Sequence, residues 1–368
     1  MKFQRLGLIF TFIFIFAFSV FAQTPTPTPT IEDDGEVIKV DSRLVIVPVS
    51  VLDTNGQPIL GLTAKDFRVM EENRLQEIAE VSTAEKVPLE IVLLFDISSS
   101  TDAMFEFEQE TAAQFLKNVM RPEDRATIFT LGSEPRLILS RETAEKSAIA
   151  IKNINPTKTQ EFTAFYDSVY TAAEYLQKNA PQGRRKVIVV ISDGEDTNSA
   201  GISRAMFEAE RKITDGNLSG EKLREIRVKA RDSAKLKEQN KVLKGLQNAD
   251  TVFYSINPAG NSLQFNKMSR FGQENLQRFA DDTGGTAFLP KLLPIATKDE
   301  LQNSANTRRN TEILQTIFRQ LANELQAQYL IQYYSDAEFP LNRYVNLNIG
   351  LQNPRNLRVR ARQGYFVK

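Results

Sequence analysis

The stretch that most constrains the fold is an apolar run that ends in an acid. Ile91 to Phe95 are five apolar residues in a row, and Asp96-Ile97-Ser98-Ser99-Ser100 follows directly. An uninterrupted apolar run of this length is typical of a strand that is buried on both faces, as in the middle of a parallel sheet. Asp96 then lies at the carboxyl end of that strand, which is where open α/β sheets place their ligands.

The loop after this strand presents side-chain oxygens at intervals of two residues. Asp96, Ser98 and Ser100 supply one carboxylate and two hydroxyls, a set that suits a hard divalent cation such as Mg²⁺. The same residues also fit the end of a strand followed by a serine-rich turn that binds nothing, because short motifs produce false matches. Both interpretations stay open at this point.

The central part of the chain alternates between strands and helices. Two further apolar runs, Lys186–Ile191 and Thr251–Ile256, predict buried strands, and the first of them ends in Ser192-Asp193. This alternation predicts a doubly wound, Rossmann-like α/β domain whose largely parallel sheet has helices on both faces. The helices are predicted from apolar stripes at helical spacing: residues 102–120, 142–154, 164–177, 273–283 and 310–326.

The flanks of this domain read as β structure. Residues 37–86 contain strands such as Phe67–Glu71 and Ile78–Ser82 with a turn at residues 73–76, and residues 328–368 contain three or four more strands. Each flank is too small for a complete sandwich, so we expect the two to pair into one β-sandwich-like module. The predicted domains are therefore an N-terminal β module at 37–86, an α/β domain at 87–327 and a C-terminal β segment at 328–368.

The N-terminus predicts export to the cell envelope, the periplasm or the medium. Residues 1–22 have a basic start, a short apolar core and small residues before a cleavage point after Ala22, which is typical of a signal peptide. An uncleaved N-terminal anchor is the alternative. Residues 23–36 begin with a Thr-Pro repeat, which favours an extended linker over a packed segment.

Residues 199–248 interrupt the regular alternation. A single helix would normally join the two strands here, but about fifty strongly charged residues separate them. Residues 201–244 contain twelve Lys and Arg against seven Asp and Glu. This insertion is expected to be helical. It is either a solvated excursion or an arm for an acidic or membrane surface.

The composition excludes most catalytic sites. The chain has no cysteine and no histidine, so a Ser-His-Asp triad, a thiolate nucleophile and a His-ligated zinc site are all excluded. A metal would have to be held by oxygen atoms. Lys and Arg number 46, as do Asp and Glu, so no net charge points to nucleic acid.

Three oxygen-bearing segments are predicted to meet at one edge of the sheet. Asp96, Ser98 and Ser100 follow one buried strand, Asp193 follows another, and Thr163 lies in the loop before a helix. Two such strands can be neighbours at the topological switch point of a doubly wound sheet. The five side chains could then converge on one cation although they span almost a hundred residues.

This pattern resembles the von Willebrand factor type A (VWA) domain and its metal-ion-dependent adhesion site (MIDAS). The family's Asp-x-Ser-x-Ser, Thr and Asp correspond in order to Asp96, Ser98, Ser100, Thr163 and Asp193, although Glu161-Phe162 replaces the small residues that often precede the Thr. The flanking segments Gly61–Phe67 and Arg360–Tyr365 are similar to bacterial secreted VWFA-related proteins. The resemblance implies a bound Mg²⁺, or Mn²⁺ or Ca²⁺, with one open position that a partner's Asp or Glu fills.

Three functions from different classes remain. The first is an exported, non-enzymatic protein-binding or adhesion module that uses the metal. The second is an envelope scaffold whose metal site is structural or vestigial. The third is an aspartate-nucleophile phosphatase, which would need a second acid where Ser98 stands. No nucleic-acid partner is expected. A membrane contact is expected only through an uncleaved N-terminus or the basic residues 201–244.

Overall fold

The computed structural model describes residues 43–84, 87–97, 102–157, 162–214, 219–258, 267–295, 298–354 and 356–367. The predicted signal peptide at 1–22 and the linker at 23–36 lie outside these residues, as do Ser98 and Ser100. None of the helices within the described ranges is long and apolar enough to cross a membrane.

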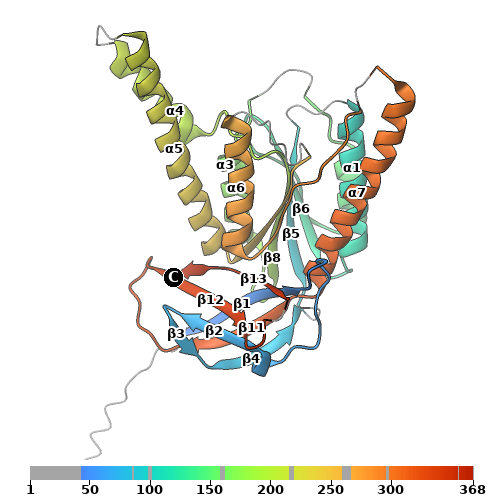
Figure 1. Cartoon of the computed structure of the whole chain (residues 1–368), viewed down its shortest axis with the longest axis vertical. Helices are drawn as coiled ribbons and strands as arrows, with labels where there is room; N and C mark the ends of the chain where they lie inside the picture. Colours follow the sequence, from blue (N-terminus) through green and yellow to red (C-terminus); the bar gives the residue numbers. More distant parts are fainter. Residues whose placement is uncertain are drawn as a thin grey trace, which may run out of the picture. The chain divides into compact units, whose positions relative to one another are not determined.

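A six-stranded sheet forms the centre of the α/β domain (Figure 1). Neighbouring strands run parallel except at one edge, where β7 is antiparallel to β6. This confirms the predicted doubly wound sheet. In spatial order the strands are β10 (Ala287–Phe288), β9 (Thr251–Ile256), β8 (Arg185–Ile191), β5 (Leu89–Asp96), β6 (Arg125–Leu131) and β7 (Arg136–Glu142).

The order in which the chain adds strands to the sheet changes direction at β5. The chain continues from β5 to β6 on one side and later returns to place β8 on the other side. Phe95 pairs with Ile191 at the ends of β5 and β8. The carboxyl ends of these two strands therefore define the switch point, where the connections leave in opposite directions and a ligand can approach the sheet.

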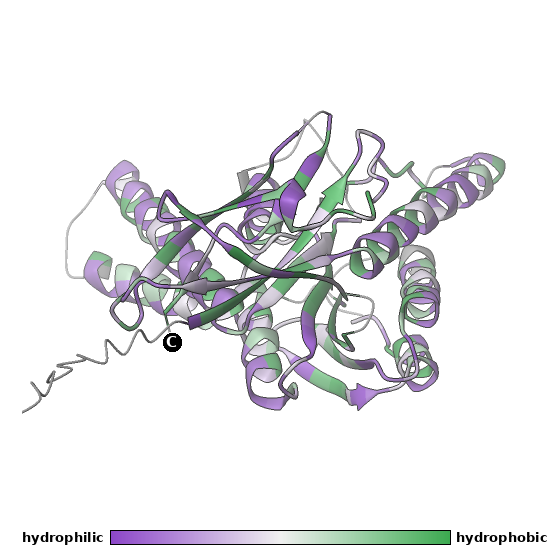
Figure 2. Cartoon of the chain, turned by 90° about the horizontal axis from the view of Figure 1, so that it is seen from below, coloured by the Kyte–Doolittle hydropathy of each residue, from purple (hydrophilic) through white to green (hydrophobic). Residues whose placement is uncertain are grey.

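Helices cover both faces of the sheet, because alternate residues of each strand point to opposite sides. Leu93 and Phe95 pack on one face and Val92 and Leu94 on the other. In Figure 2 much of the strand length is hydrophobic, whereas the helices alternate between hydrophilic and hydrophobic residues. The first face holds α1 (Asp102–Val119), α2 (Ala144–Lys152) and α7 (Glu300–Gln326), and the second holds α3 (Phe165–Asn179), α5 (Gly220–Asn248) and α6 (Lys267–Thr283).

The two flanks form a β sandwich together, as the sequence predicts. Strand β1 from the N-terminal flank pairs with β11 from the C-terminal flank, and β2 pairs with β12. A shared core of Val, Leu, Ile and Tyr side chains lies between the sheets. One sheet is β13 (Arg358–Ala361), β1 (Arg43–Leu52), β11 (Tyr329–Ser335) and β4 (Ile78–Thr83), and the other is β14 (Gly364–Phe366), β12 (Tyr344–Leu351), β2 (Phe67–Glu71) and β3 (Arg74–Gln76).

Three elements differ from the sequence-based expectation. Residues 73–76 are not only a turn, because Arg74–Gln76 forms a strand that pairs with β2. A short 3₁₀ helix, η1 (Ala64–Asp66), precedes β2. Helix α7 begins ten residues earlier than predicted, at Glu300, where the side chain of Asp299 caps it. Helix α6 begins at Lys267 instead of residue 273. The first turns of α7 are exposed and lack the apolar stripe on which such predictions rest.

The charged insertion forms a helical hairpin. It consists of α4 (Ala200–Thr214) and the 29-residue α5, which pack against each other. The carboxyl half of α5 is packed, with Val242 and Leu246 buried against α3 and the sheet. The insertion is therefore helical, as predicted, and it consists of two helices. Only part of it is a solvated excursion, because the carboxyl half of α5 is packed.

Candidate metal centre

Asp96 and Asp193 lie at the carboxyl ends of neighbouring strands. Asp96 is the last residue of β5, and Asp193 is the second residue after β8. Ser192 lies between them in space, and its hydroxyl donates a 2.6 Å hydrogen bond to Oδ2 of Asp96. The same hydroxyl accepts a hydrogen bond from the backbone N–H of Gly194 at 3.1 Å. The two predicted ligand segments are thus joined directly through one serine.

Thr163 is held against the loop that carries Asp193. Its backbone carbonyl accepts hydrogen bonds from the N–H groups of Thr197 at 2.9 Å and Asn198 at 3.0 Å. Its own N–H donates to the hydroxyl of Thr197 at 2.7 Å. These three bonds fix the Thr163 backbone to the 192–199 loop, so the distant sequence position of this threonine is brought to the same edge of the sheet.

The structure therefore brings together three of the five predicted ligands. Asp96, Thr163 and Asp193 belong to one connected edge, whereas Ser98 and Ser100 lie outside the described residues. The two serines follow Asp96 by two and four residues in the sequence. Their role as ligands stays a prediction.

Close backbone packing sets the conformation of the Asp193 loop. Gly194 has φ +75°, and a Cβ there would lie 2.5 Å from the carbonyl oxygen of Gly272 in α6. A Cβ on Gly272 would in turn lie 2.6 Å from the carbonyl oxygen of Asp193. Only glycine fits both positions, because any side chain would push α6 off the loop. Helix α6 therefore presses directly on the residue that carries the predicted ligand.

Buried Asn275 ties the same loop to the neighbouring helices. Its Nδ2 donates to the carbonyl of Gly194 at 3.2 Å. Its Oδ1 accepts hydrogen bonds from the Tyr166 hydroxyl in α3 and from Gln239 Nε2 in α5, both at 3.0 Å. The backbone next to Asp193 is consequently held by α3, α5 and α6 together.

The family comparison agrees with this geometry. Residues 91–195 match the model of the von Willebrand factor type A domain, and this match spans β5, β8 and the loop with Asp193. The α/β domain is a VWA domain. A comparison with curated proteins gave no match.

Solved structures to which this chain is similar include two proteins from Bacteroides and one from a mussel. An aerotolerance-related membrane protein from Bacteroides fragilis is 14% identical with a TM-score of 0.35, covering 62% of this chain and 99% of that chain. BatB from Bacteroides thetaiotaomicron is 14% identical with a TM-score of 0.33, covering 61% and 98%. Proximal thread matrix protein 1 from the mussel byssus, with a zinc-occupied MIDAS motif, is 12% identical with a TM-score of 0.36, covering 69% and 50%.

Negative charge accumulates at this edge of the VWA domain. Burial, and to a smaller degree the charge of Asp96, raises the pKa of the Asp193 carboxyl to about 6, against the hydrogen bond from the N–H of Glu195. Neither Asp193 nor Glu108 forms an ion pair with a described lysine or arginine. A carboxylate that is buried without a cation is costly in its charged form.

Glu108 is a member of this acidic edge that sequence reasoning missed. It lies in α1, it is 3% exposed, and its Oε1 has no hydrogen-bond partner. Burial, with the nearby charge of Asp96, raises the pKa of Glu108 to about 8. A signal was available, because Glu108 follows Phe105 by three residues and precedes Ala112 by four, which puts an acid on the buried stripe of the helix.

The donor set fits a hard cation that is held partly by hydroxyls. Across the described ranges, no three acidic side chains converge closely enough to bind a metal by themselves. Two aspartates with the Thr163 hydroxyl and the two serines would supply the all-oxygen set that Mg²⁺ takes. Buried Glu108 has an oxygen without a hydrogen-bond partner, and the pKa of Asp193 is raised. Both observations are expected where a bound cation would stabilise the carboxylates.

Proposed function

We propose that this chain is an exported, non-enzymatic protein-binding module. In this proposal Asp96, Ser98, Ser100, Thr163 and Asp193 hold a divalent cation, with Mg²⁺ as the first candidate. When bound, the cation supplies a Lewis-acid position that a partner's Asp or Glu completes. Export rests on the N-terminal sequence of residues 1–22 alone.

The observation that carries the proposal is the gathering of one buried and two half-buried carboxylates at one sheet edge. Asp96 and Asp193 lie at the carboxyl ends of neighbouring parallel strands, and Glu108 in α1 is close enough to Asp96 to feel its charge. The pKa values of Asp193 and Glu108 are raised because burial disfavours their charged forms. A cation at this edge would stabilise all three charges, whereas a serine-rich turn without an ion would leave them uncompensated.

The protein's own groups preorganise the ligand atoms. Ser192 orients Asp96 through one carboxylate oxygen, and the N–H of Glu195 holds Oδ1 of Asp193 at 2.9 Å. The backbone of Thr163 is fixed by Thr197, and no hydrogen bond to its hydroxyl is described.

A hydrophobic side chain stands next to the candidate site. Phe162 precedes Thr163 and is 64% exposed. We infer that Phe162 packs against the partner beside its metal-bound carboxylate, because exposed aromatic side chains are frequent anchors of protein interfaces.

Calorimetry with Mg²⁺ and Mn²⁺ tests the metal. The wild-type protein should bind one equivalent, and Asp193→Ala should weaken binding at least ~100-fold, since it removes a direct ligand and not only a supporting group. Asp336→Ala is the matched control, because Asp336 is exposed and follows β11 of the sandwich, outside the α/β domain that carries the site. If wild type and Asp193→Ala titrate alike, the metal assignment is wrong.

The mode of partner binding is tested separately. A partner isolated on immobilised protein from envelope extracts should be released by EDTA, and it should be retained less well by Phe162→Ser although that variant binds the metal normally. A partner that is held equally well with and without EDTA would instead identify the chain as an envelope scaffold whose metal site does not take part.

A further inference from the structure

The α4–α5 hairpin concentrates positive charge on an otherwise acidic protein. Residues 201–244 carry a formal charge of +5, and because the whole chain has equal numbers of acidic and basic residues, the rest carries −5. Charge that is segregated to this degree creates a local potential that attracts an oppositely charged partner. The hairpin is therefore positively charged, whereas the rest of the protein is negatively charged.

Contacts within the protein use only part of this positive charge. Lys235 and Lys244 lie over the rings of Phe271 and Phe366. Three ion pairs engage further cations: Arg227–Glu210 at 2.6 Å, Lys222–Glu225 at 2.9 Å and Lys241–Glu238 at 3.4 Å. The other basic residues are exposed and make no ion pair with a described carboxylate: Arg204, Arg211, Lys212, Arg224, Lys229, Arg231 and Lys237.

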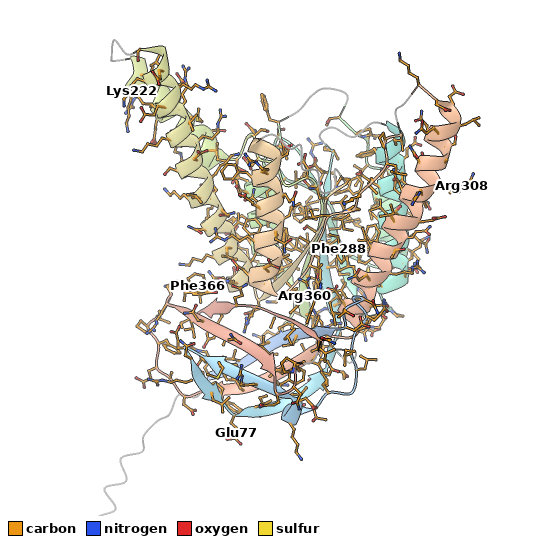
Figure 3. All side chains as sticks on the ribbon, in the orientation of Figure 1. Glu77, Lys222, Phe288, Arg308, Arg360 and Phe366 are labelled. Carbon is orange, nitrogen blue, oxygen red and sulfur yellow. The ribbon has the colours of Figure 1, made fainter. Side chains whose placement is uncertain are left out.

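The hairpin begins at the candidate metal centre. Helix α4 starts at Ala200, whose N–H donates to Oδ2 of Asp167 at 2.7 Å, directly after the loop that holds Thr163. The carboxyl half of α5 is packed on α3 and α6, whereas its first turns contact α4. Figure 3 shows Lys222 near the outer end of the hairpin, at the end of the molecule away from the sandwich. One extended partner can therefore touch the metal edge and the hairpin together.

The distribution of the exposed cations favours a protein over a membrane. At 100° per residue, Arg224 and Arg231 lie on one side of α5, whereas Lys229 and Lys237 lie on other sides. A helix that lies on a bilayer instead needs a continuous apolar face opposite its cations. An acidic polypeptide can contact cations on several sides of a projecting hairpin, and it also offers the carboxylate that the metal edge is proposed to take.

We propose that the outer part of the α4–α5 hairpin binds an acidic segment of the same partner protein whose carboxylate completes the metal site. This inference rests on the proposed function, because it assigns the class of partner to that site. The partner then carries a run of Asp and Glu, with one acid at the cation and others along the hairpin. Long-range attraction by the hairpin accelerates association and weakens with salt.

The test is the fluorescence anisotropy of a labelled polyglutamate peptide, with Mg²⁺ and with EDTA. Arg224→Glu/Arg231→Glu should weaken peptide binding roughly tenfold and flatten its salt dependence. The matched control is Lys117→Glu/Arg319→Glu, which makes the same charge change at exposed residues of α1 and α7. Circular dichroism verifies that both variants are folded, and polyserine of equal length is the peptide control.

Each outcome separates this inference from the proposed function. Wild-type affinity in the α5 variant, or an equal loss in the control variant, overturns the hairpin assignment. Binding of wild type to vesicles with anionic lipids but not to polyglutamate overturns the choice of a protein partner. Calorimetry with Mg²⁺ is run in parallel on all three proteins. Loss of peptide binding with intact Mg²⁺ binding supports the hairpin, whereas a wild type that binds no Mg²⁺ refutes the metal proposal instead.

Discussion

Two buried glutamates in different parts of the molecule have opposite surroundings. Glu71, in the core of the β sandwich, is 2% exposed and accepts hydrogen bonds from the hydroxyls of Tyr333, Tyr365 and Ser335 at 2.7–2.8 Å. Glu108, under the edge of the VWA domain, is buried to a similar degree but has an oxygen without a partner. One carboxylate is satisfied by the fold, and the other is not.

We interpret this difference as that between a structural acid and an acid at the candidate metal centre. Three hydroxyl donors delocalise the charge of Glu71 and fix the register of β2, β11 and β14 around it. Burial and the adjacent Glu71 raise the pKa of Tyr365 to about 12, so that its hydroxyl remains a donor. Glu108 instead has an oxygen without a partner, and Asp193 accepts the N–H of Glu195 rather than a set of hydroxyls. In our proposal a cation completes the surroundings of both. Three substitutions test this contrast.

Glu71→Ala should have the largest effect, a loss of about 4 kcal/mol in the free energy of unfolding. The substitution leaves three buried hydroxyl groups without an acceptor, and each unsatisfied group costs about 1–3 kcal/mol. Urea denaturation measures the loss, with the exposed Glu77→Ala as control. Mg²⁺ affinity of the folded variant should be unchanged. A loss below about 1 kcal/mol would show that Glu71 is not the satisfied acid described above.

Glu108→Gln should stabilise the metal-free protein at alkaline pH. The folded-state pKa of Glu108 is raised from 4.5 to about 8, so the native state keeps a proton that the unfolded state releases. Wild-type stability therefore falls as the pH rises through that window, by on the order of 3 kcal/mol at pH 7, and the variant avoids this loss.

Urea unfolding in EDTA across the pH range measures this difference, with Glu106→Gln on the exposed side of the same helix as control. Saturating Mg²⁺ should reduce the advantage of the variant, because a cation stabilises the charged form of Glu108. An advantage that does not depend on pH would contradict the assignment of Glu108 to the acidic edge.

Asn275→Leu should have the smallest effect, a loss of roughly tenfold in Mg²⁺ affinity, or about 1.4 kcal/mol. Asn275 does not touch the metal position but holds the carbonyl of Gly194 beside Asp193, and supporting groups of this kind are worth 10–100-fold in metal affinity. Calorimetry is done where the variant is fully folded, with the exposed Gln277→Ala as control. Unchanged affinity would mean that the loop holds Asp193 without help from α6.

Local sequence patterns were sufficient for most of the fold. The run Ile91–Phe95 had to become a buried strand, since no other element shields five consecutive apolar side chains so simply. The turn at 73–76 was predicted only in part, because Arg74–Gln76 is a strand through its pairing with Val69–Glu71. The early start of α7 escaped prediction because its first ten residues depend on the Asp299 cap and not on an apolar stripe.

The candidate site divides in the same way. Asp96 and Asp193 were predictable because each follows an apolar run, and parallel strands bring such ends to one edge. Glu108 and Asn275 were not singled out, because their importance depends on what packs against them. Asn275 acquires its role only when α3, α5 and α6 meet over Gly194.

The sequence by itself determined the kind of chemistry available to this protein. A chain without histidine or cysteine, with Asp96, Ser98 and Ser100 after a buried strand, can hold a metal only through oxygen. The tertiary structure decided where charge is left uncompensated. It buries Glu108 next to Asp96 and presses α6 onto Gly194, while it surrounds Glu71 with hydroxyls. The reason is that residue type and spacing are local properties, whereas the cost of a buried charge depends on neighbours that only folding brings together.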